Sequence, residues 1–216
     1  MKRDQHRHEI KRKVLRISRA LFMKKGYSKT TIKEITQAAG ITTGSLYHFF
    51  NGKQDILLNL TQEVFTSAAT FADLMVKKKT DPWLQFALEI GIQLYLVQMF
   101  DTFAELYLAA HESPDIARVI VRSAETRNKR LFQSHCPEFT SEHFYAAALA
   151  VKGIFHSFVQ ESVYNRQNVS TTSMFLAIEM MLVLFKIPSD EIERTIQAMY
   201  ALIKEVPLSL FNLDAF

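Results

Sequence analysis

The chain lacks the residues and segments that would tie it to a disulfide scaffold, a zinc finger or a membrane. It has one cysteine, Cys136, among 216 residues, so a disulfide framework within one chain and a zinc finger are both excluded. No uncharged apolar run approaches the ~18 residues of a membrane span, and no apolar signal core follows the polar residues 1–8. We therefore expect a soluble, cytoplasmic protein with no membrane partner.

Glycine and proline, which usually interrupt helices, are also scarce. The chain has six glycines and five prolines, and Pro82, Pro114 and Pro188 each fall at or just before an expected helix start. No segment alternates apolar and polar residues as a half-buried strand does. Because 48% of the residues are apolar, the chain can bury a sizeable core. The expected fold class is all-α.

Patterns of catalysis and metal binding are missing as well. The sequence has no glycine-rich phosphate loop, no nucleophile elbow and no Glu-x-x-His pair of the kind that di-iron bundles use. His135 and Cys136 are adjacent in a predicted loop, and sequence neighbours rarely share one metal. His156 lies on an apolar helix and is interpreted as a core histidine. We expect no catalytic residues, no metal and no cofactor, and hence no enzyme.

Positive charge is concentrated at the N-terminus. Residues 1–55 hold 13 Lys and Arg against 4 Asp and Glu, whereas residues 56–216 hold 13 against 18. The overall net charge of +4 therefore conceals a strongly basic segment on a mildly acidic remainder. A basic segment of this kind favours binding to the phosphates of nucleic acid.

Within this basic segment, residues 26–53 predict two short helices separated by a tight turn. Thr31, followed three residues later by Glu34, is a capping box that starts the first helix. Gly40 follows an apolar stripe and is suited to the left-handed conformation that ends a helix. Thr42 is then a good N-cap for the second helix. This arrangement is typical of a helix-turn-helix that places its second helix in the major groove of DNA.

The second helix, expected over residues 43–50, has an inner and an outer side. Leu46 and Phe50 form the inner side. The outer side bears small, hydroxylated or hydrogen-bonding groups suited to base edges and phosphates. These candidate DNA contacts are Thr43, Gly44, Ser45, Tyr47 and His48.

Residues at matching order and spacing extend through the first quarter of the chain. They are Phe22, Gly26, Tyr27, Thr30, Thr31, Ile35, Ala39, Gly40, Ile41, the run from Gly44 to Phe50, Lys53, Ile56 and Leu57. With them the segment resembles the DNA-binding domain of the tetracycline-repressor (TetR) family, and the run Leu-Tyr-x-x-Phe-x-x-Lys is its most specific part. Thr30, Thr31, Thr42 and Lys53 complete the expected DNA contacts. Lys53 opens a fourth helix and is expected to grip a phosphate there.

The resemblance implies a helix-turn-helix head of three helices, residues 1–52, and a helical ligand-binding and dimerisation domain, residues 53–216. The apolar tail at 207–216 is expected to dock on another part of the protein. Helical periodicity predicts helices over 8–25, 53–79, 82–99, 101–111, 114–134, 141–165, 170–186 and 189–205.

Family members commonly bind a small molecule in the larger domain, so the resemblance implies an effector pocket there. Most aromatic residues in this half are expected to be core, but pockets between helices are lined by similar side chains. Charge is sparse in these segments, so the expected effector is small and largely apolar. Glu89 and Glu105 are expected to face solvent, and the alternative is that they select for a cationic effector. The candidate pocket residues are Phe86, Tyr95, Phe103, Tyr107 and Phe155.

A homodimer is expected because one helix-turn-helix contacts only a few base pairs, and two copies on two half-sites give useful specificity. The helix over 141–165 carries a broad apolar face, and Gly153 permits close helix approach. Its partner in the dimer is either 170–186 or 189–205, and the sequence leaves both open. The expected face is Phe144, Ala147, Ala148, Val151, Phe155, Phe158 and Val159 on the first helix, with Ile192, Ile196, Met199, Tyr200 and Ile203 on the last.

Taken together, the residues and the resemblance favour a dimeric, sequence-specific regulator of transcription that binds double-stranded DNA. The favoured mechanism is a repressor that binds a palindromic operator and is released by its ligand. Alternatives of the same fold are an activator, or a regulator whose effector is a protein or that has no effector. Two rivals of other classes are an all-α enzyme with a DNA-binding head and a structural DNA-binding protein without sequence preference.

Overall fold

The computed structural model describes residues 2–76, 81–165 and 170–211, and within these ranges every regular element is a helix. The all-α prediction is confirmed. The elements are α1 (Lys2–Lys25), α2 (Ile32–Ala39), α3 (Thr43–Tyr47), α4 (Lys53–Met75), α5 (Pro82–Met99), α6 (Asp101–Glu112), α7 (Pro114–Phe132), α8 (Ser141–Tyr164), α9 (Thr171–Val183), α10 (Ser189–Ile203) and the 3₁₀ turn η2 (Leu208–Phe211).

Local capping fixes the helix starts close to their predicted positions. The side chains of Asp81, Ser113 and Ser170 each accept a hydrogen bond from the backbone N–H three residues later. Proline occupies the first turn of α5 and α7, where its missing N–H costs nothing. These starts depend on a few neighbouring residues, which is why the sequence was sufficient to predict them.

The start of α1 and the C-terminal ends of several helices differ more from the prediction. α1 begins at Lys2 rather than near residue 8, and α3 ends at Tyr47 rather than at residue 50. The helices α7, α8, α9 and α10 each end one to three residues earlier than expected. The predicted end of the fourth helix near residue 79 lies outside the described residues.

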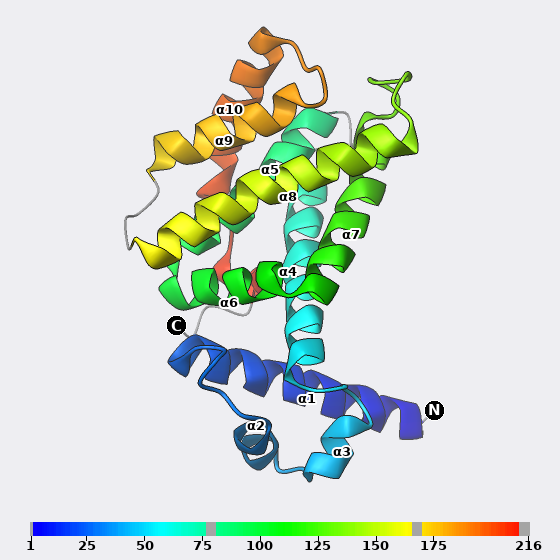
Figure 1. Cartoon of the computed structure of the whole chain (residues 1–216), viewed down its shortest axis with the longest axis vertical. Coiled ribbons are helices and arrows are strands. Elements are labelled where there is room, and N and C mark those ends of the chain that lie inside the picture. The colour runs from blue at the N-terminus through cyan, green and yellow to red at the C-terminus, as the bar shows by residue number, and fades with distance from the viewer. Residues whose placement is uncertain (1, 77–80, 166–169, 212–216) are drawn as a thin grey trace.

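The head, residues 2–52, lies at one end of the molecule, with α1 across its upper side and α2 and α3 below (Figure 1). The long helix α4 rises from the head into the body beside α5 (Figure 1). The packing of the head does not stop at residue 52, because its buried cluster also includes side chains from α4, α6 and α7. This head core is Val14, Leu15, Phe22, Ile35, Ala39, Leu46, Phe50, Ile56, Leu57, Leu60, Leu106, Ala110, Ile116 and Ile120.

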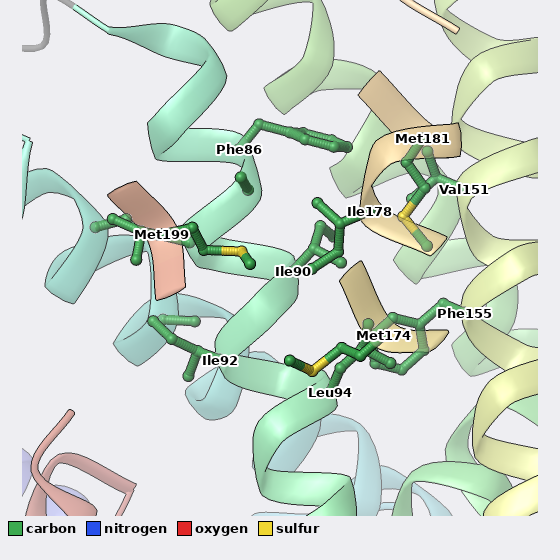
Figure 2. Packing of buried hydrophobic residues seen from close by; sticks show 14 of the residues in the cluster. Phe86, Ile90, Ile92, Leu94, Val151, Phe155, Met174, Ile178, Met181 and Met199 are labelled. Carbon is green, nitrogen blue, oxygen red and sulfur yellow. The ribbon is translucent and has the colours of Figure 1, made fainter. Parts of the chain in front are cut away.

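The body is built around α5, which is buried along most of its length. Figure 2 shows Met199 of α10 on one side of α5, and Met174, Ile178 and Met181 of α9 on the other. Gly91 permits the close approach of α10, since a Cβ at this position would lie 2.7 Å from the sulfur of Met199. The body is therefore packed densely around one central helix.

The two helix faces that the sequence assigned to a dimer are largely buried within the chain itself. On α8, Phe144, Ala148 and Val159 are fully buried against neighbouring helices. On α10, Met199 and Ile203 are buried in the same core. The apolar periodicity was detected correctly, but it marks the inner faces of both helices, so this prediction was wrong.

The described part of the apolar tail docks as expected. Phe211 is buried, and the hydroxyl of Ser67 on α4 donates a hydrogen bond of 3.1 Å to the carbonyl of Leu210. Residues 212–216 lie outside the described residues.

Candidate DNA-binding head and effector cavity

Two capping interactions fix the helix-turn-helix. Thr31 and Glu34 form the predicted capping box, in which the Thr31 N–H donates to Glu34 at 2.8 Å and the Glu34 N–H donates to the Thr31 hydroxyl at 3.3 Å. Lys25 also pairs with Glu34. Hydrogen bonds from Lys25 and Thr31 lower the pKa of Glu34 to about 2. The carboxylate is therefore ionised at neutral pH and holds the start of α2 to the end of α1.

The turn between α2 and α3 is a left-handed cap. Gly40 has φ 63° and ψ 37°, a conformation that glycine adopts at little cost. The Ile41 N–H then donates to the carbonyl of Thr36 at 3.1 Å. Thr42 caps α3 by accepting a hydrogen bond of 3.1 Å from the Ser45 N–H. The direction in which α3 leaves the head is thus fixed by local backbone chemistry.

This geometry exposes one side of α3. Leu46 is buried in the head core, whereas Tyr47 is 54% exposed and Thr43, Gly44 and His48 are also exposed. Ser45 is half-buried. Basic residues of α1 lie close by, with Arg7 5.9 Å from the ring centre of Phe49 and Lys11 5.6 Å from that of Phe50.

Two of the expected DNA contacts, Thr30 and Lys53, have backbone partners within the head. Thr30 is only 1% exposed, and its hydroxyl donates a hydrogen bond of 2.9 Å to the carbonyl of Gly26. The assignment of Thr30 to DNA was therefore wrong, because the side chain closes the loop between α1 and α2. Thr31 and Thr42 are exposed, but their hydroxyls already serve as caps.

Lys53, which is half-buried, also has backbone partners within the head. Its ammonium group donates to the carbonyls of Tyr27 at 2.9 Å and Thr30 at 3.0 Å, and it lies 4.3 Å from the ring centre of Tyr27. Burial lowers its pKa. The structure thus shows Lys53 joining the start of α4 to the loop before α2, and the expected phosphate grip stays a prediction.

The body contains a cavity of about 800 Å³ between α4, α5, α6, α7 and α8. Its apolar walls are Phe65, Ile90, Ile120, Val151 and Phe155. The rest of its lining is small or polar, and includes Gln62, Glu89, Gln93, His111, Arg122, Ser123, Thr126, Arg127, Arg130 and Lys152. This volume lies within the usual range for small-molecule sites.

Of the five residues predicted to line a pocket, only Phe155 does so. Phe86 packs against Phe132 and Phe185 in the core, with ring centres 5.4 Å away in both cases. Tyr95 is a half-buried core residue. The predictions for Phe86 and Tyr95 were wrong because α5 meets the cavity mainly through its polar side, which carries Glu89 and Gln93.

Phe103 and Tyr107, also predicted to line the pocket, lie beside a separate cavity of only about 20 Å³. Tyr107 instead contacts a residue of the large cavity, since its hydroxyl donates a hydrogen bond of 2.7 Å to the side chain of Gln93. A sequence signal for the true lining existed. Gln85, Glu89 and Gln93 recur every four residues in an otherwise apolar helix, which marks one polar stripe.

Glu89 is the most deeply placed charge of the cavity. It is 2% exposed rather than solvent-facing as expected, and its Oε2 lies 3.1 Å from Arg127. Burial raises the pKa of Glu89, and the nearby guanidinium of Arg127 opposes this rise. The other oxygen, Oε1, is buried and has no hydrogen-bond partner among the described residues. The carboxylate therefore presents an unused acceptor at the cavity.

His111 is a second buried polar group with unused hydrogen-bonding capacity. It is 4% exposed and stacks against Tyr107, Phe155 and His156 at ring-centre distances of 5.6, 5.4 and 6.0 Å. Neither ring nitrogen has a partner in the described part of the chain. Burial, together with Lys152 and His156, lowers the pKa of His111 to about 3. The imidazole is therefore neutral and offers one donor and one acceptor.

The described residues contain no group of three His, Cys, Asp or Glu side chains that would hold a metal ion. None of the described helices is both long enough and apolar enough to cross a membrane.

The head matches a known family model. The model for bacterial regulatory proteins of the tetR family covers residues 14–60, which include α2, α3 and the first turns of α4. The head of the chain is therefore of the TetR type.

Curated relatives of this chain are named as regulators of transcription. HbdR of Aromatoleum sp. (strain CIB) is 24% identical over 142 residues, which cover 65% of this chain and 60% of the relative. The repressor KstR2 of Rhodococcus jostii (strain RHA1) is 43% identical over 44 residues, which are 20% of this chain and 22% of the relative. These matches thus span less than two thirds of each relative.

Solved structures match the chain over most of its length. RolR, solved in complex with its ligand resorcinol, has a TM-score of 0.69 at 19% identity and covers 89% of this chain and 95% of its own. SmeT, the repressor of the Stenotrophomonas maltophilia multidrug efflux pump SmeDEF, has a TM-score of 0.57 at 17% identity, covering 80% and 88%. Because identity is low, these matches establish the fold of head and body.

The chain also exposes apolar side chains on two neighbouring helices. They lie on the outer sides of α8 and α9, opposite the faces that pack into the body, and Gly153 lies open on the same side of α8. These exposed residues are Leu149 and Tyr164 on α8 and Leu176, Met180 and Val183 on α9.

Proposed function

We propose that this protein is a homodimeric transcriptional repressor that binds a palindromic operator through α3 and releases it when a small molecule occupies the 800 Å³ cavity. The observation that carries the proposal is that the cavity and the head core share walls. Ile120 of α7 belongs to both, lining the cavity and packing in the head core. A ligand that favours one arrangement of α7 will therefore shift the head.

A second shared element is α6. His111 faces the cavity, whereas Ala110 and Leu106 of the same helix pack in the head core. The other end of α6 meets the loop after α1, where a Cβ at Gly26 would lie 3.2 Å from the carboxylate of Glu105. Helices with two such faces give a physical route from effector to DNA, with a coupling of about 1–3 kcal/mol in typical systems.

The operator contacts in this proposal are the exposed residues of α3, namely Thr43, Gly44, Tyr47 and His48, with Thr31, Thr42 and Ser45 flanking them. Arg7 and Lys11 of α1 add positive charge close by. Residues 1–52 then form the DNA-binding domain and residues 53–216 the sensing and dimerising domain, with the first turns of α4 shared between the two cores.

The proposed dimer interface is the exposed side of α8 and α9. The alternative partner, α10, uses Ile192, Met199 and Ile203 to pack within its own chain. The outer side of α9 remains open and bears Leu176, Met180 and Val183. Two copies paired through these faces would form a four-helix interface and present two heads to two half-sites.

The test begins by sequencing the genomic fragments that the protein retains, which yields an operator for gel-shift titration. Ala124→Trp, placed at the lining of the cavity on α7, is expected to leave operator binding intact and to prevent release by the effector. Ala117→Trp on the same helix, which is outside the lining, serves as the matched control. Retention of fragments without a shared sequence would contradict operator recognition, and a normal response of Ala124→Trp would contradict the cavity as the sensor.

A reporter gene placed behind the operator separates repression from activation. Deleting the regulator raises expression if it is a repressor and lowers it if it is an activator.

A further inference from the structure

We infer that the cavity takes an amphipathic organic anion, with its oxyanion held by Arg130 and Lys152 and its body directed towards Glu89 and His111. This inference rests on the proposed sensing function and adds the chemical class of the effector. It replaces the largely apolar effector that the sequence favoured.

The charges of the lining carry the first step. Four cationic side chains line the cavity, Arg122, Arg127, Arg130 and Lys152, against one carboxylate, that of Glu89. A wall with this imbalance favours an anionic guest, because the positive potential of the lining attracts it.

Two of the four cations already have carboxylate partners. Arg127 pairs with Glu89 at 3.1 Å, and Arg122 pairs with Glu125 at 3.1 Å. Arg130 of α7 and Lys152 of α8 form no ion pair within the described ranges. The charge of Arg130 acts to lower the pKa of Glu89, but neither group is held in an ion pair, so both supply positive charge to the cavity from two different helices of its wall.

The buried polar atoms carry the second step. His111 is 4% exposed, and neither of its ring nitrogens has a hydrogen-bond partner among the described residues. The Oε1 of Glu89 is also buried and also lacks a partner there. Burying such atoms without a partner is unfavourable, because they have given up their hydrogen bonds to water. A guest with an N–H or hydroxyl on its body would satisfy them, whereas a pure hydrocarbon would not.

The apolar walls carry the third step. Phe65, Ile90 and Phe155 offer surface to a ring or chain, and Phe155 is stacked 5.4 Å from His111. The guest is therefore amphipathic, with an oxyanion at one end and an apolar body that bears a hydrogen-bonding group. Carboxylates, sulfonates and phosphates share this oxyanion chemistry.

Two fluorescent probes with the same body test the inference. 8-Anilinonaphthalene-1-sulfonate carries an oxyanion, and N-phenyl-1-naphthylamine is the same body without it. Both are titrated into the full chain without DNA. The double substitution Arg130→Gln with Lys152→Gln is expected to weaken the sulfonate by about tenfold, the scale of one hydrogen bond to a charged group, and to leave the neutral probe unchanged.

The matched control is the double substitution Arg118→Gln with Lys129→Gln, which removes the same charge from exposed positions of α7 outside the lining. It is expected to leave both probes unchanged. His111→Phe keeps the ring stack and removes the nitrogens, so it is expected to weaken both probes, since both carry the same N–H. A substitution at Arg130 and Lys152 with no selective effect on the sulfonate, or the absence of sulfonate binding, overturns the anion assignment. Unchanged binding of both probes to His111→Phe overturns the placement of the body.

The proposed regulatory function fails separately from this inference. Charge-selective probe binding without operator release by any anion would contradict ligand-released repression and leave the anion site standing. Operator release by a cation or a neutral compound that displaces neither probe would support ligand-released repression and contradict an anionic effector.

Discussion

The helix-turn-helix and the cavity use their polar groups in opposite ways. Around α2 and α3, the side chains of Thr31, Glu34 and Thr42 each bond to backbone within three residues. Around the cavity, His111 and the Oε1 of Glu89 are buried without a partner among the described residues. Hydrogen-bonded caps hold the helices of the head in one arrangement. Polar atoms without partners at the wall of a large cavity are able to form hydrogen bonds to a ligand. In the proposed function, DNA is therefore recognised by a surface whose polar groups are already bonded, and the effector by groups that still lack partners.

The largest expected effect comes from breaking the ion pair of the cavity. Arg127→Met leaves the carboxylate of Glu89 buried and unpaired, and it should lower the free energy of unfolding by about 3–5 kcal/mol at neutral pH. Urea unfolding of the full chain measures this loss. Adding Glu89→Gln to the same variant should restore most of it, because no uncompensated charge then remains. A double variant as unstable as the single one would show that the loss comes from packing instead.

The next largest effect is the dependence of stability on pH that His111 imposes. Its pKa is about 3 in the folded protein and near 6.5 when exposed. As the pH falls below 6.5, the unfolded chain takes up a proton that the folded chain does not, so stability is lost. The loss is roughly 1.4 kcal/mol per pH unit until the pH approaches 3. Between pH 6.5 and 4.5 it should reach about 2–3 kcal/mol.

Urea unfolding at several pH values checks this, with His111→Phe as the variant that removes the contribution. His8→Gln, at an exposed position of α1, is the control and should keep the wild-type profile. If the profile of His111→Phe matched that of the wild type, the histidine would have to find a partner on protonation.

On the side of the head, Tyr47→Ala tests whether α3 contacts the operator. Tyr47 is 54% exposed, so its removal should leave stability unchanged and weaken operator binding by about 1–3 kcal/mol, the scale of a good contact. Gel-shift titration against the retained operator measures the change. The control is Tyr200→Ala, which removes an exposed tyrosine of α10 in the body and should bind the operator with wild-type affinity. Equal affinity for both variants would remove Tyr47 from the interface.

The smallest effect distinguishes the two roles of Lys53. If the lysine holds the loop of Tyr27 and Thr30, Lys53→Met should lower stability by about 1–2 kcal/mol and leave the salt dependence of DNA binding unchanged. If it gripped a phosphate, the slope of log affinity against log salt would fall by about one unit. Titrations at several salt concentrations, with the exposed Lys24→Met as control, give the answer.

The sequence predicted the helix-turn-helix in detail because its determinants are local. The capping box needs only Thr31 and Glu34, and the left-handed turn needs only Gly40. The starts of the later helices were predicted for the same reason, since Asp81 and Ser113 act on backbone three residues away. Interactions over so short a distance are visible in any window of the chain.

The pocket residues were not predictable in the same way. Whether Phe86 or Glu89 faces the cavity depends on the rotation of α5 about its axis, and α10, α9 and α8 fix that rotation by packing around it (Figure 2). The apolar stripes of α8 and α10 likewise do not say whether they meet their own chain or a second copy. Periodicity identifies a buried face but not what covers it.

By itself, the sequence determined the all-α class, the basic head, the caps and turn of the helix-turn-helix, and the exposure of Tyr47 opposite Leu46. Tertiary structure alone decided that Thr30 is buried, that Lys53 bonds to carbonyls 23 and 26 residues earlier, and that Glu89, His111 and Arg127 meet around one cavity. The physical reason is the range of the interactions. Caps and turns close within a few residues of backbone, whereas a cavity exists only where five separate helices fail to fill the space between them.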